Sequence, residues 1–356
     1  MLPTMTDAPK PSPLASPEPW SLVADDYTLE LLPMFELFSR DALALAPTPP
    51  GARILDVAAG PGTLTLIAAE SGRSVSAIDF SPQMVMNLKR RLNGAQLGAD
   101  VRLGDGQALP WGDAEFDAAF SMFGLMFFPD RARGFSELYR VLKPGGVAVV
   151  SSWATLEGIF ASIMAAMREV LPEIPFGTGK GPLADPEEFA RELAAAGFAD
   201  VKVTAQTHAL PGGAPRDIWA QSQRTTAPIV LLKKHLGEAK WTKVTSDVVE
   251  RLEAQYGTDP VDIKTTAYLA FAKKPGRIRP HPGPRPLRAW PNRPFVDVGD
   301  VRGSATRIHF RPRRKICATA RAWRGWHRYR VRSRKPDRRQ EDRNQADECG
   351  RVRRAR

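Results

Sequence analysis

The stretch Ile54-Leu55-Asp56-Val57-Ala58-Ala59-Gly60-Pro61-Gly62-Thr63 decides how the rest of the chain is interpreted. An apolar run ends in small residues, and apolar side chains then return at helical spacing, which predicts a strand, a tight turn and a helix. Glycine at 60 and 62 lets the backbone approach a ligand where a Cβ atom would collide, and the first amides of the helix face that ligand. The pattern is typical of a nucleotide-binding turn, and it also fits a turn with a purely structural role.

The spacing of the glycines excludes two common nucleotide sites. A dinucleotide-binding turn has a third glycine three residues after the second, and Thr65 stands there instead. A phosphate-binding loop ends in Gly-Lys-Ser or Gly-Lys-Thr, and neither sequence occurs in the chain.

Composition bounds the size and the partners of the protein. The chain has 356 residues, 43% of them hydrophobic, which is enough for one large or two ordinary domains. The net charge of +12 suggests a nucleic-acid partner, but residues 276–356 hold 25 Lys and Arg against 7 Asp and Glu, a net of +18. Residues 1–275 hold 26 against 32, a net of −6, so the body of the chain is acidic and only its last part is basic.

The ends of the chain differ from the body. Residues 1–19 are crowded with proline, which blocks helix and ladder hydrogen bonds, so this segment is predicted to be disordered. There is no signal-peptide pattern and no apolar run long enough to span a membrane. Both cysteines, Cys317 and Cys349, lie in the basic part. We therefore expect no disulfide framework, no metal site and a cytoplasmic location.

Apolar residues between Trp20 and Leu45 recur at helical spacing. They predict one or two helices, interrupted at Pro33. These helices either pack against the core or bring Trp20, Tyr27 and Phe35 over a ligand site.

Strands and helices then alternate along the chain. Strands are predicted at residues 54–57, 75–78, 101–103, 116–123, 147–153, 201–207 and 265–272. Helices are predicted between the early strands, including one that Ser81 caps before Pro82. This alternation is typical of a doubly wound, mostly parallel α/β sheet.

Acidic residues follow the second and third strands. Asp79 can accept hydrogen bonds from both hydroxyls of a ribose. Asp105 can accept from an exocyclic amine, while Gly106 and Gln107 offer backbone groups to the edge of a base. Met84 can lie under an adenine ring or pack in the core.

Five stretches occur in the order and spacing of a known family: 54–63, 77–84, 104–110, 111–117 and 137–146, the last reading Glu-Leu-Tyr-Arg-Val-Leu-Lys-Pro-Gly-Gly. Together they resemble the class I S-adenosylmethionine-dependent methyltransferases, above all the small-molecule branch that includes ubiquinone and menaquinone C-methyltransferases. The resemblance covers about residues 20–275. It implies a Rossmann-like fold with seven strands, S-adenosylmethionine as cofactor, and methyl transfer to a small molecule whose acceptor atom is oxygen, nitrogen or carbon.

The resemblance also implies a set of cofactor-binding residues. Asp56 and Gly60 would contact the methionine part, Asp79 the ribose, and Asp105, Gln107 and Met84 the adenine. The predicted site is completed by Ala58, Gly62, Phe80, Gly106 and Ser121. Ala58 departs from the family, which usually has its first glycine there, and this leaves open how closely residue 58 approaches the cofactor.

Two regions beyond the fifth strand are predicted to be helical cap elements that select the acceptor. Residues 154–182 contain an apolar helix and a Pro/Gly loop, and residues 208–260 are predicted to form two helices, at 218–236 and 241–256. His208, at the end of the sixth strand, is a candidate general base because its ordinary pKa lies near neutrality, or it is an ordinary loop residue.

Residues 276–356 contain 23 Arg and no helical or strand period. They form a nucleic-acid-binding arm, a disordered tail, or an out-of-frame extension of a GC-rich gene. The alternative function is accordingly that of an RNA methyltransferase or nucleic-acid-binding protein. The acidic body argues against it, and so does Ser121-Met122-Phe123-Gly124, which stands where base amino-methylating enzymes carry Asn/Asp-Pro-Pro-Tyr/Phe. A cofactor-binding relative without catalytic activity is a third alternative.

Overall fold

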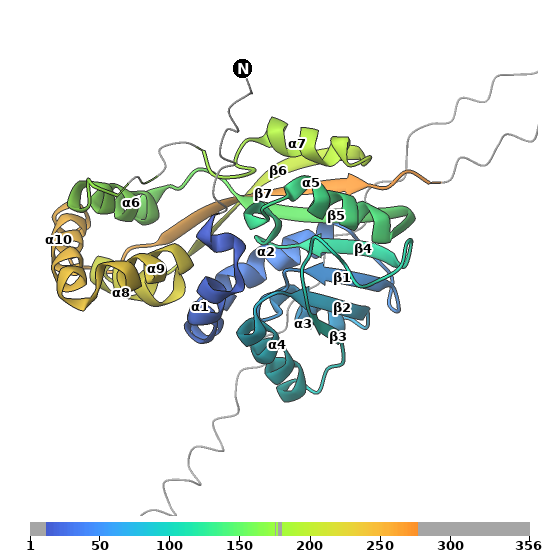
Figure 1. Ribbon diagram of the computed structural model, residues 1–356, viewed down its shortest axis with the longest axis horizontal. Helices are drawn as coiled ribbons and strands as arrows, with labels where there is room; N and C mark the ends of the chain where they lie inside the picture. Colours follow the sequence, from blue (N-terminus) through green and yellow to red (C-terminus); the bar gives the residue numbers. More distant parts are fainter. Residues whose placement is uncertain (1–11, 175, 177–179, 277–356) are drawn as a thin grey trace, which may run out of the picture. The chain divides into compact units, whose positions relative to one another are not determined.

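The computed structural model describes residues 12–174, 176 and 180–276 (Figure 1). The predicted disorder of residues 1–11 and the predicted role of the basic tail beyond Gly276 lie outside the described residues. Within the described ranges, no helix combines the length and the apolar character that crossing a membrane requires.

Seven strands form one sheet in the order β3-β2-β1-β4-β5-β7-β6. They are β1 (Arg53–Val57), β2 (Ser74–Asp79), β3 (Asp100–Leu103), β4 (Phe116–Ser121), β5 (Leu142–Trp153), β6 (Ala199–Leu210) and β7 (Ile263–Lys273). Neighbouring strands are parallel except where β7 pairs with β5 and with β6. The predicted doubly wound, mostly parallel sheet of seven strands is confirmed.

The α-helices in the described part of the chain are α1 (Pro17–Glu30), α2 (Leu32–Leu45), α3 (Thr63–Glu70), α4 (Pro82–Gly94), α5 (Arg131–Val141), α6 (Gly158–Val170), α7 (Pro186–Ala195), α8 (Pro215–Thr225), α9 (Ala227–Leu236) and α10 (Glu238–Tyr256). Two short 3₁₀ helices are η1 (Pro13–Ala15) and η2 (Leu125–Phe127). Residues 215–256 thus form three helices where the sequence predicts two. Pro228, in the first turn of α9, lacks the N–H that would continue α8.

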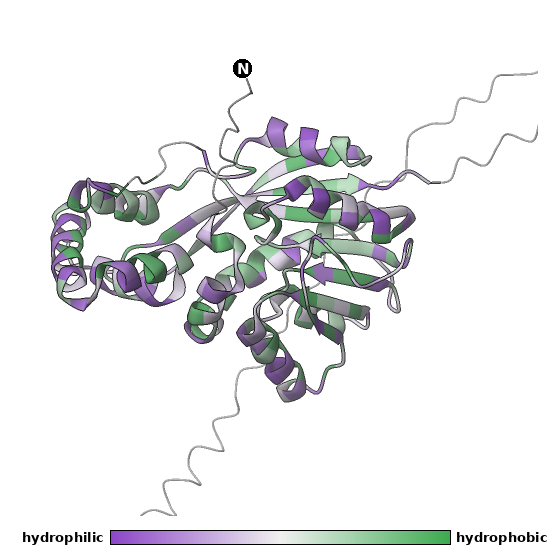
Figure 2. Ribbon diagram, in the orientation of Figure 1, coloured by the Kyte–Doolittle hydropathy of each residue, from purple (hydrophilic) through white to green (hydrophobic). Residues whose placement is uncertain are grey.

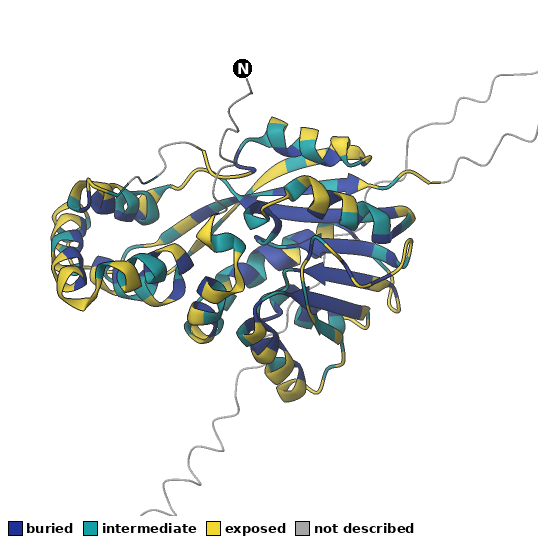
Figure 3. Ribbon diagram, in the orientation of Figure 1, coloured by how far each residue is buried: buried dark blue, intermediate teal, exposed yellow. Residues whose placement is uncertain are grey.

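Helices cover both faces of the sheet. Ile54 and Leu55 are both fully buried, and successive side chains of a strand point to opposite faces. Ile54 packs with Phe38 of α2 on one face, which α3 and α4 also cover, whereas Leu55 packs with Phe135 of α5 on the other face, beside α7. The inner strands β1, β2 and β4 are therefore buried on both sides, as in Figure 3, and carry many apolar residues, as in Figure 2, whereas the residues of β3 and β6 are half-buried or exposed.

Helical structure is present in part of the proline-rich segment for which the sequence predicts disorder. The sequence predicts disorder through residue 19, but η1 and α1 begin at Pro13 and Pro17. Pro17 occupies the first turn of α1, where the missing N–H has no intrahelical partner in any case. Ser12 Oγ accepts a hydrogen bond from Leu14 N at 3.3 Å, which stabilises the start of η1.

The two predicted cap regions are helical and share a separate apolar core. Helices α6, α8 and α10 pack around Trp219 and Trp241, whose ring centroids lie 5.8 Å apart. Ala227 at the start of α9 packs with Val23 and Ala24 of α1. Helix α1 thus lies between these helices and α4 (Figure 1).

Candidate functional site

The turn between β1 and α3 passes through the left-handed region of the backbone map three times. The φ angle is 55° at Ala58, 54° at Gly60 and 83° at Gly62. Glycine adopts such angles without steric cost, whereas an alanine there costs roughly 1–2 kcal/mol. Because α3 begins at Thr63, its unpaired first amides lie beside this turn.

Asp79 ends β2 next to the turn, and two backbone amides hold its carboxylate. Gly60 N donates to Oδ2 and Ser81 N donates to Oδ1, each at 2.8 Å. Burial raises the pKa of Asp79 to about 6, against the backbone amides of Ser81, Gly60 and Phe80, which lower it. Each carboxylate oxygen keeps a further lone pair. The group is therefore fixed in orientation and still able to accept hydrogen bonds from a ligand.

The loop after β3 carries the second acidic residue. Gln107 donates to Asp105 Oδ1 from its backbone N at 2.8 Å and from its Nε2 at 3.1 Å. Gln107 Oε1 accepts from Asp130 N at 2.9 Å, which connects the loop to the start of α5. At Gly106, a Cβ atom would lie 2.4 Å from Cζ of Phe128, so this position has no room for a side chain.

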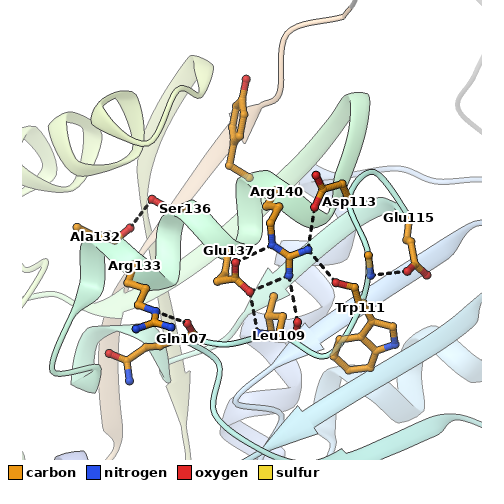
Figure 4. Close-up of polar contacts among 12 residues, drawn as sticks. Gln107, Leu109, Trp111, Asp113, Glu115, Ala132, Arg133, Ser136, Glu137 and Arg140 are labelled. Atoms are coloured by element: carbon orange, nitrogen blue, oxygen red, sulfur yellow. Dashed lines mark hydrogen bonds and ion pairs between the residues drawn. The ribbon is translucent and has the colours of Figure 1, made fainter.

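Helix α5 also fixes the far end of the same loop. Arg140 donates from Nε to Glu137 Oε1 at 2.7 Å, from Nη1 to Trp111 O at 2.8 Å and from Nη2 to Leu109 O at 3.0 Å (Figure 4). Glu137 Oε2 in turn accepts from Leu109 N at 2.7 Å. The pair on α5 therefore positions the segment that follows Asp105.

A cavity of about 330 Å³ lies where β1, β2, β3 and β4 end at the same edge of the sheet. Its walls come from the turn after β1, the end of β2, the loop after β3, the loop after β4, and the segment formed by η1 and α1. Asp79 and Asp105 both line it, so two strand ends place two carboxyl groups in one cavity. A Cβ atom on Gly60 would meet no atom within 4 Å.

The described residues that line the cavity include six aromatic ones: Trp20, Tyr27, Phe80, Phe123, Phe127 and Phe128. The ring centroids of Trp20 and Phe127 lie 5.0 Å apart, and Trp20 Nε1 donates to Leu14 O at 2.9 Å, which holds η1 at the cavity. Among the described residues that line it there is no Lys, Arg or His. Carboxylates and π faces without a competing cation favour a positively charged ligand.

Most of the predicted cofactor residues meet here. The lining includes Ala58, Gly60, Asp79, Phe80, Met84, Asp105, Gly106 and Gln107. Asp56, Gly62, Ser121 and His208 are not among the lining residues. Met84 is only 3% exposed and packs with Val23 and Ala24, as the core interpretation predicts, and it also lines the cavity; its contact with an adenine ring stays a prediction.

Asp56 is buried beneath the turn. Its Oδ2 accepts from Thr65 Oγ1 of α3 at 2.7 Å. Burial raises its pKa to about 7; the Thr65 hydrogen bond lowers the pKa, and the charge of Asp79 raises it further. The side chain thus connects β1 to α3 and does not reach the cavity.

Gly62 and Ser121 shape the surroundings of the cavity. A Cβ atom on Gly62 would lie 2.0 Å from Cδ1 of Leu88, so this glycine allows α3 and α4 to approach. Ser121 is fully buried, and its Oγ accepts from Leu125 N at 3.2 Å, which fixes the loop after β4.

His208 lies near the end of β6, on the face that α2 covers. Its Nε2 is 2.7 Å from Asp41 Oδ2, and its ring meets that of Phe38 edge-on at 4.7 Å. Its known partners are therefore residues of α2.

Several lining residues were not among the predicted site residues, although Ile78 and Gly104 lie within the stretches 77–84 and 104–110: Leu14, Ala15, Pro17, Ile78, Gly104, Met122, Phe123, Gly124, Phe127, Phe128 and Pro129. The apolar run after β4 was the available signal, since a loop at a sheet edge has few other reasons to be aromatic. No described residue of α6 or of α8 to α10 lines the cavity. Within the described ranges, no three His, Cys, Asp or Glu side chains converge as a metal ion would require.

Comparison with known proteins gives the following relatives. The family described as "methyltransferase domain" matches residues 55–150. An uncharacterised protein of Mycobacterium tuberculosis is 37% identical over 155 residues, which cover 44% of this chain and 56% of that protein. The demethylmenaquinone methyltransferase of Renibacterium salmoninarum is 34% identical over 166 residues, covering 43% of this chain and 68% of that enzyme.

The chain thus spans about half the length of the first curated relatives it matches. Among solved structures, phosphoethanolamine N-methyltransferase 2 of Haemonchus contortus, in complex with S-adenosylhomocysteine, is similar at a TM-score of 0.41 and 21% identity. The match covers 66% of this chain and 52% of that one.

Proposed function

This chain belongs to the class I S-adenosylmethionine-dependent methyltransferases, and from that premise we propose that it methylates a small-molecule acceptor with S-adenosylmethionine as cofactor. The observation that carries the proposal is the meeting of Asp79 and Asp105 with six aromatic rings in one cavity that no described cationic side chain lines.

The cavity residues fit the cofactor in charge and in shape. When bound, S-adenosylmethionine supplies a methyl group on a positively charged sulfonium. Carboxylates and aromatic faces stabilise such a charge. The open space beside Gly60 lets a ligand pass close to the backbone, where a side chain would otherwise project.

Within this proposal each polar residue has a defined task. Asp79, oriented by Gly60 N and Ser81 N, would accept from the ribose hydroxyls. Asp105 would accept from the adenine amine, on a loop held by Gln107 and by Arg140. These residues bind and orient, and in an in-line displacement orientation supplies much of the rate enhancement.

The rest of the lining suits an apolar or aromatic acceptor. Trp20, Phe123 and Phe127 offer flat apolar contacts and would keep water away from an acceptor bound against them. Among the described lining residues, the only titratable groups are Asp79, Asp105 and Tyr27. We therefore propose an acceptor that reacts without a dedicated histidine base, for example an activated carbon or an acidic phenol.

Calorimetry with S-adenosylmethionine and S-adenosylhomocysteine tests the first half of the proposal. Binding of both at one site per chain supports it, and Asp79→Asn serves as the weakened control. A labelled-methyl screen over phenols, quinone precursors, amines and lipids then tests the second half. A chain that binds neither nucleoside ligand is not the proposed enzyme. Transfer confined to RNA would replace the small-molecule acceptor with a nucleic acid.

A further inference from the structure

Among the described residues that line the cavity, only Tyr27 of α1 combines an aromatic ring with a hydroxyl group. Its ring stacks on Phe35 of α2, with centroids 5.1 Å apart and an angle of 22° between the planes. Phe35 packs in turn against Phe123 at 5.2 Å and Trp153 at 5.8 Å. The phenol is therefore held by an aromatic cluster that is anchored on β5.

Hydrogen bonds fix helix α1 against α4. The backbone that carries the Tyr27 phenol is therefore held in place. Ser21 Oγ lies 2.8 Å from Ser81 Oγ. Asn87 Nδ2 donates to Ala24 O at 3.1 Å and to Asp25 Oδ1 at 2.9 Å. The position of Tyr27 beside the end of β2 is thus set before any ligand binds.

The Tyr27 hydroxyl has no hydrogen-bond partner among the described residues. Burial, and after it the negative charge of Asp79, raise the pKa of this hydroxyl well above its usual value. The group consequently stays protonated and can donate a hydrogen bond, but it cannot serve as a base. A polar group that faces a cavity without a partner loses its solvation unless a ligand supplies an acceptor.

We propose that Tyr27 donates a hydrogen bond from its hydroxyl to an oxygen of the nucleoside ligand bound beside Asp79. The inference rests on the proposed function and adds a contact that no motif predicts. The ligand offers two kinds of acceptor oxygen: a ribose hydroxyl, which can donate to Asp79 and accept from Tyr27, or the carboxylate of the amino-acid part. That carboxylate needs neutral donors because no described cationic side chain lines the cavity.

The test compares Tyr27→Phe with Tyr139→Phe, using S-adenosylhomocysteine and 5′-methylthioadenosine, which lacks the amino-acid part, as probes. Tyr139 lies on α5 against Phe198 and Lys274 and does not line the cavity, so it is a matched control for the loss of one phenolic hydroxyl. We expect Tyr139→Phe to bind both probes as the wild type does.

For Tyr27→Phe we expect the Kd of S-adenosylhomocysteine to rise. A rise of roughly 3- to 10-fold for both probes identifies a ribose hydroxyl, since a neutral hydrogen bond is lost. A rise of more than about 10-fold for S-adenosylhomocysteine alone identifies the carboxylate, a charged acceptor.

Thermal unfolding separates this role from a structural one. The Tm of ligand-free Tyr27→Phe should equal that of the wild type, because the hydroxyl makes no bond there, while the ligand-induced rise in Tm should shrink. Wild-type affinity of Tyr27→Phe for both probes would overturn the inference and leave the proposed function intact. A wild-type protein that binds neither probe would instead remove the proposed function on which the inference rests.

Discussion

The methyl group of Ala58 occupies space that Gly124 leaves free: a Cβ atom on Gly124 would lie 2.2 Å from the Cβ of Ala58. The two residues belong to the turn after β1 and the loop after β4, which face each other across the cavity edge. Ala58 stands where the family usually has glycine, and it adopts a φ of 55°. The absence of a side chain at residue 124 thus accommodates the extra one at residue 58.

The first prediction concerns this pair. Gly124→Ala should lower the free energy of unfolding by about 1–3 kcal/mol, because it overfills the contact while its own backbone, at φ −97°, tolerates alanine. The double variant Ala58→Gly with Gly124→Ala should recover most of that loss. Chemical denaturation of the four proteins gives the coupling free energy. If the two substitutions change the free energy of unfolding additively, the contact with Ala58 is not the reason why a side chain at residue 124 is destabilising.

The second prediction concerns the buried carboxyl group of Asp56. Its pKa of about 7 lies above the ordinary 3.8, so the folded protein holds this proton more tightly than the unfolded chain does. The associated stabilisation is complete below about pH 4 and is lost as the pH rises toward 7, at up to about 1.4 kcal/mol per pH unit. Asp56→Asn cannot titrate, so its stability relative to the wild type should rise across this window and level off above pH 7. Urea denaturation at pH 5, 6, 7 and 8 measures the difference; a constant difference contradicts the prediction.

The third prediction concerns ligand affinity and Asp79. Hydrogen bonds donated by ligand hydroxyls favour the ionised carboxylate, whose pKa in the free protein is about 6. The affinity for S-adenosylhomocysteine should therefore fall as the pH drops below 6. Asp79→Asn should weaken binding about 10- to 100-fold at pH 7.5 and remove that part of the pH dependence. Calorimetry at pH 5.5 and 7.5 tests both statements, and an Asp79→Asn variant that keeps the wild-type pH profile would assign the titration to another group.

Asp79 and Asp105 could be predicted from the sequence because their positions follow from local patterns. Apolar runs mark the strands, and parallel strands bring their carboxyl ends to one edge. Asp56 shows the limit of that reasoning. It precedes Val57 in β1, and the alternation of side chains directs it toward Thr65 beneath the turn, away from the edge.

Helical spacing offered Trp20 and Tyr27 as residues over a ligand site, but the contacts among the aromatic lining residues could not be derived in the same way. Trp20 meets Phe127 only because α1 folds back over the edge of the sheet, and no local period encodes that contact. The break between α8 and α9 did have a signal in Pro228, which ends a helix as reliably as any residue. Long-range packing thus leaves no local pattern in the sequence, whereas the helix break at Pro228 follows from a local rule.

The fourth prediction concerns Arg140, which holds the loop that carries Asp105. Arg140→Met leaves Glu137 and two backbone carbonyl groups without their donor (Figure 4). We expect a loss of about 1–3 kcal/mol in the free energy of unfolding, together with weaker binding of S-adenosylhomocysteine. Arg191→Met is the control, since Arg191 makes a single exposed contact with Glu187 at 3.8 Å and should change stability by less than about 0.5 kcal/mol. Equal losses in the two variants would mean that the Arg140 hydrogen bonds do not hold the loop.

The last prediction concerns His208. The sequence makes it a candidate base, whereas the described cavity lining excludes it and Asp41 accounts for its Nε2. His208→Ala should therefore keep the turnover number within about twofold of the wild-type value. If His208 were the general base, its removal would lower the turnover number roughly 100-fold or more. The variant should lose about 0.5–1 kcal/mol of stability with the partly buried pair. Asp41→Asn should show the same small loss of stability and the same turnover, since it breaks the same contact from the other side. A turnover that falls at least tenfold in His208→Ala, but not in Asp41→Asn, would restore the histidine to the reaction and would require β6 to approach the acceptor during turnover.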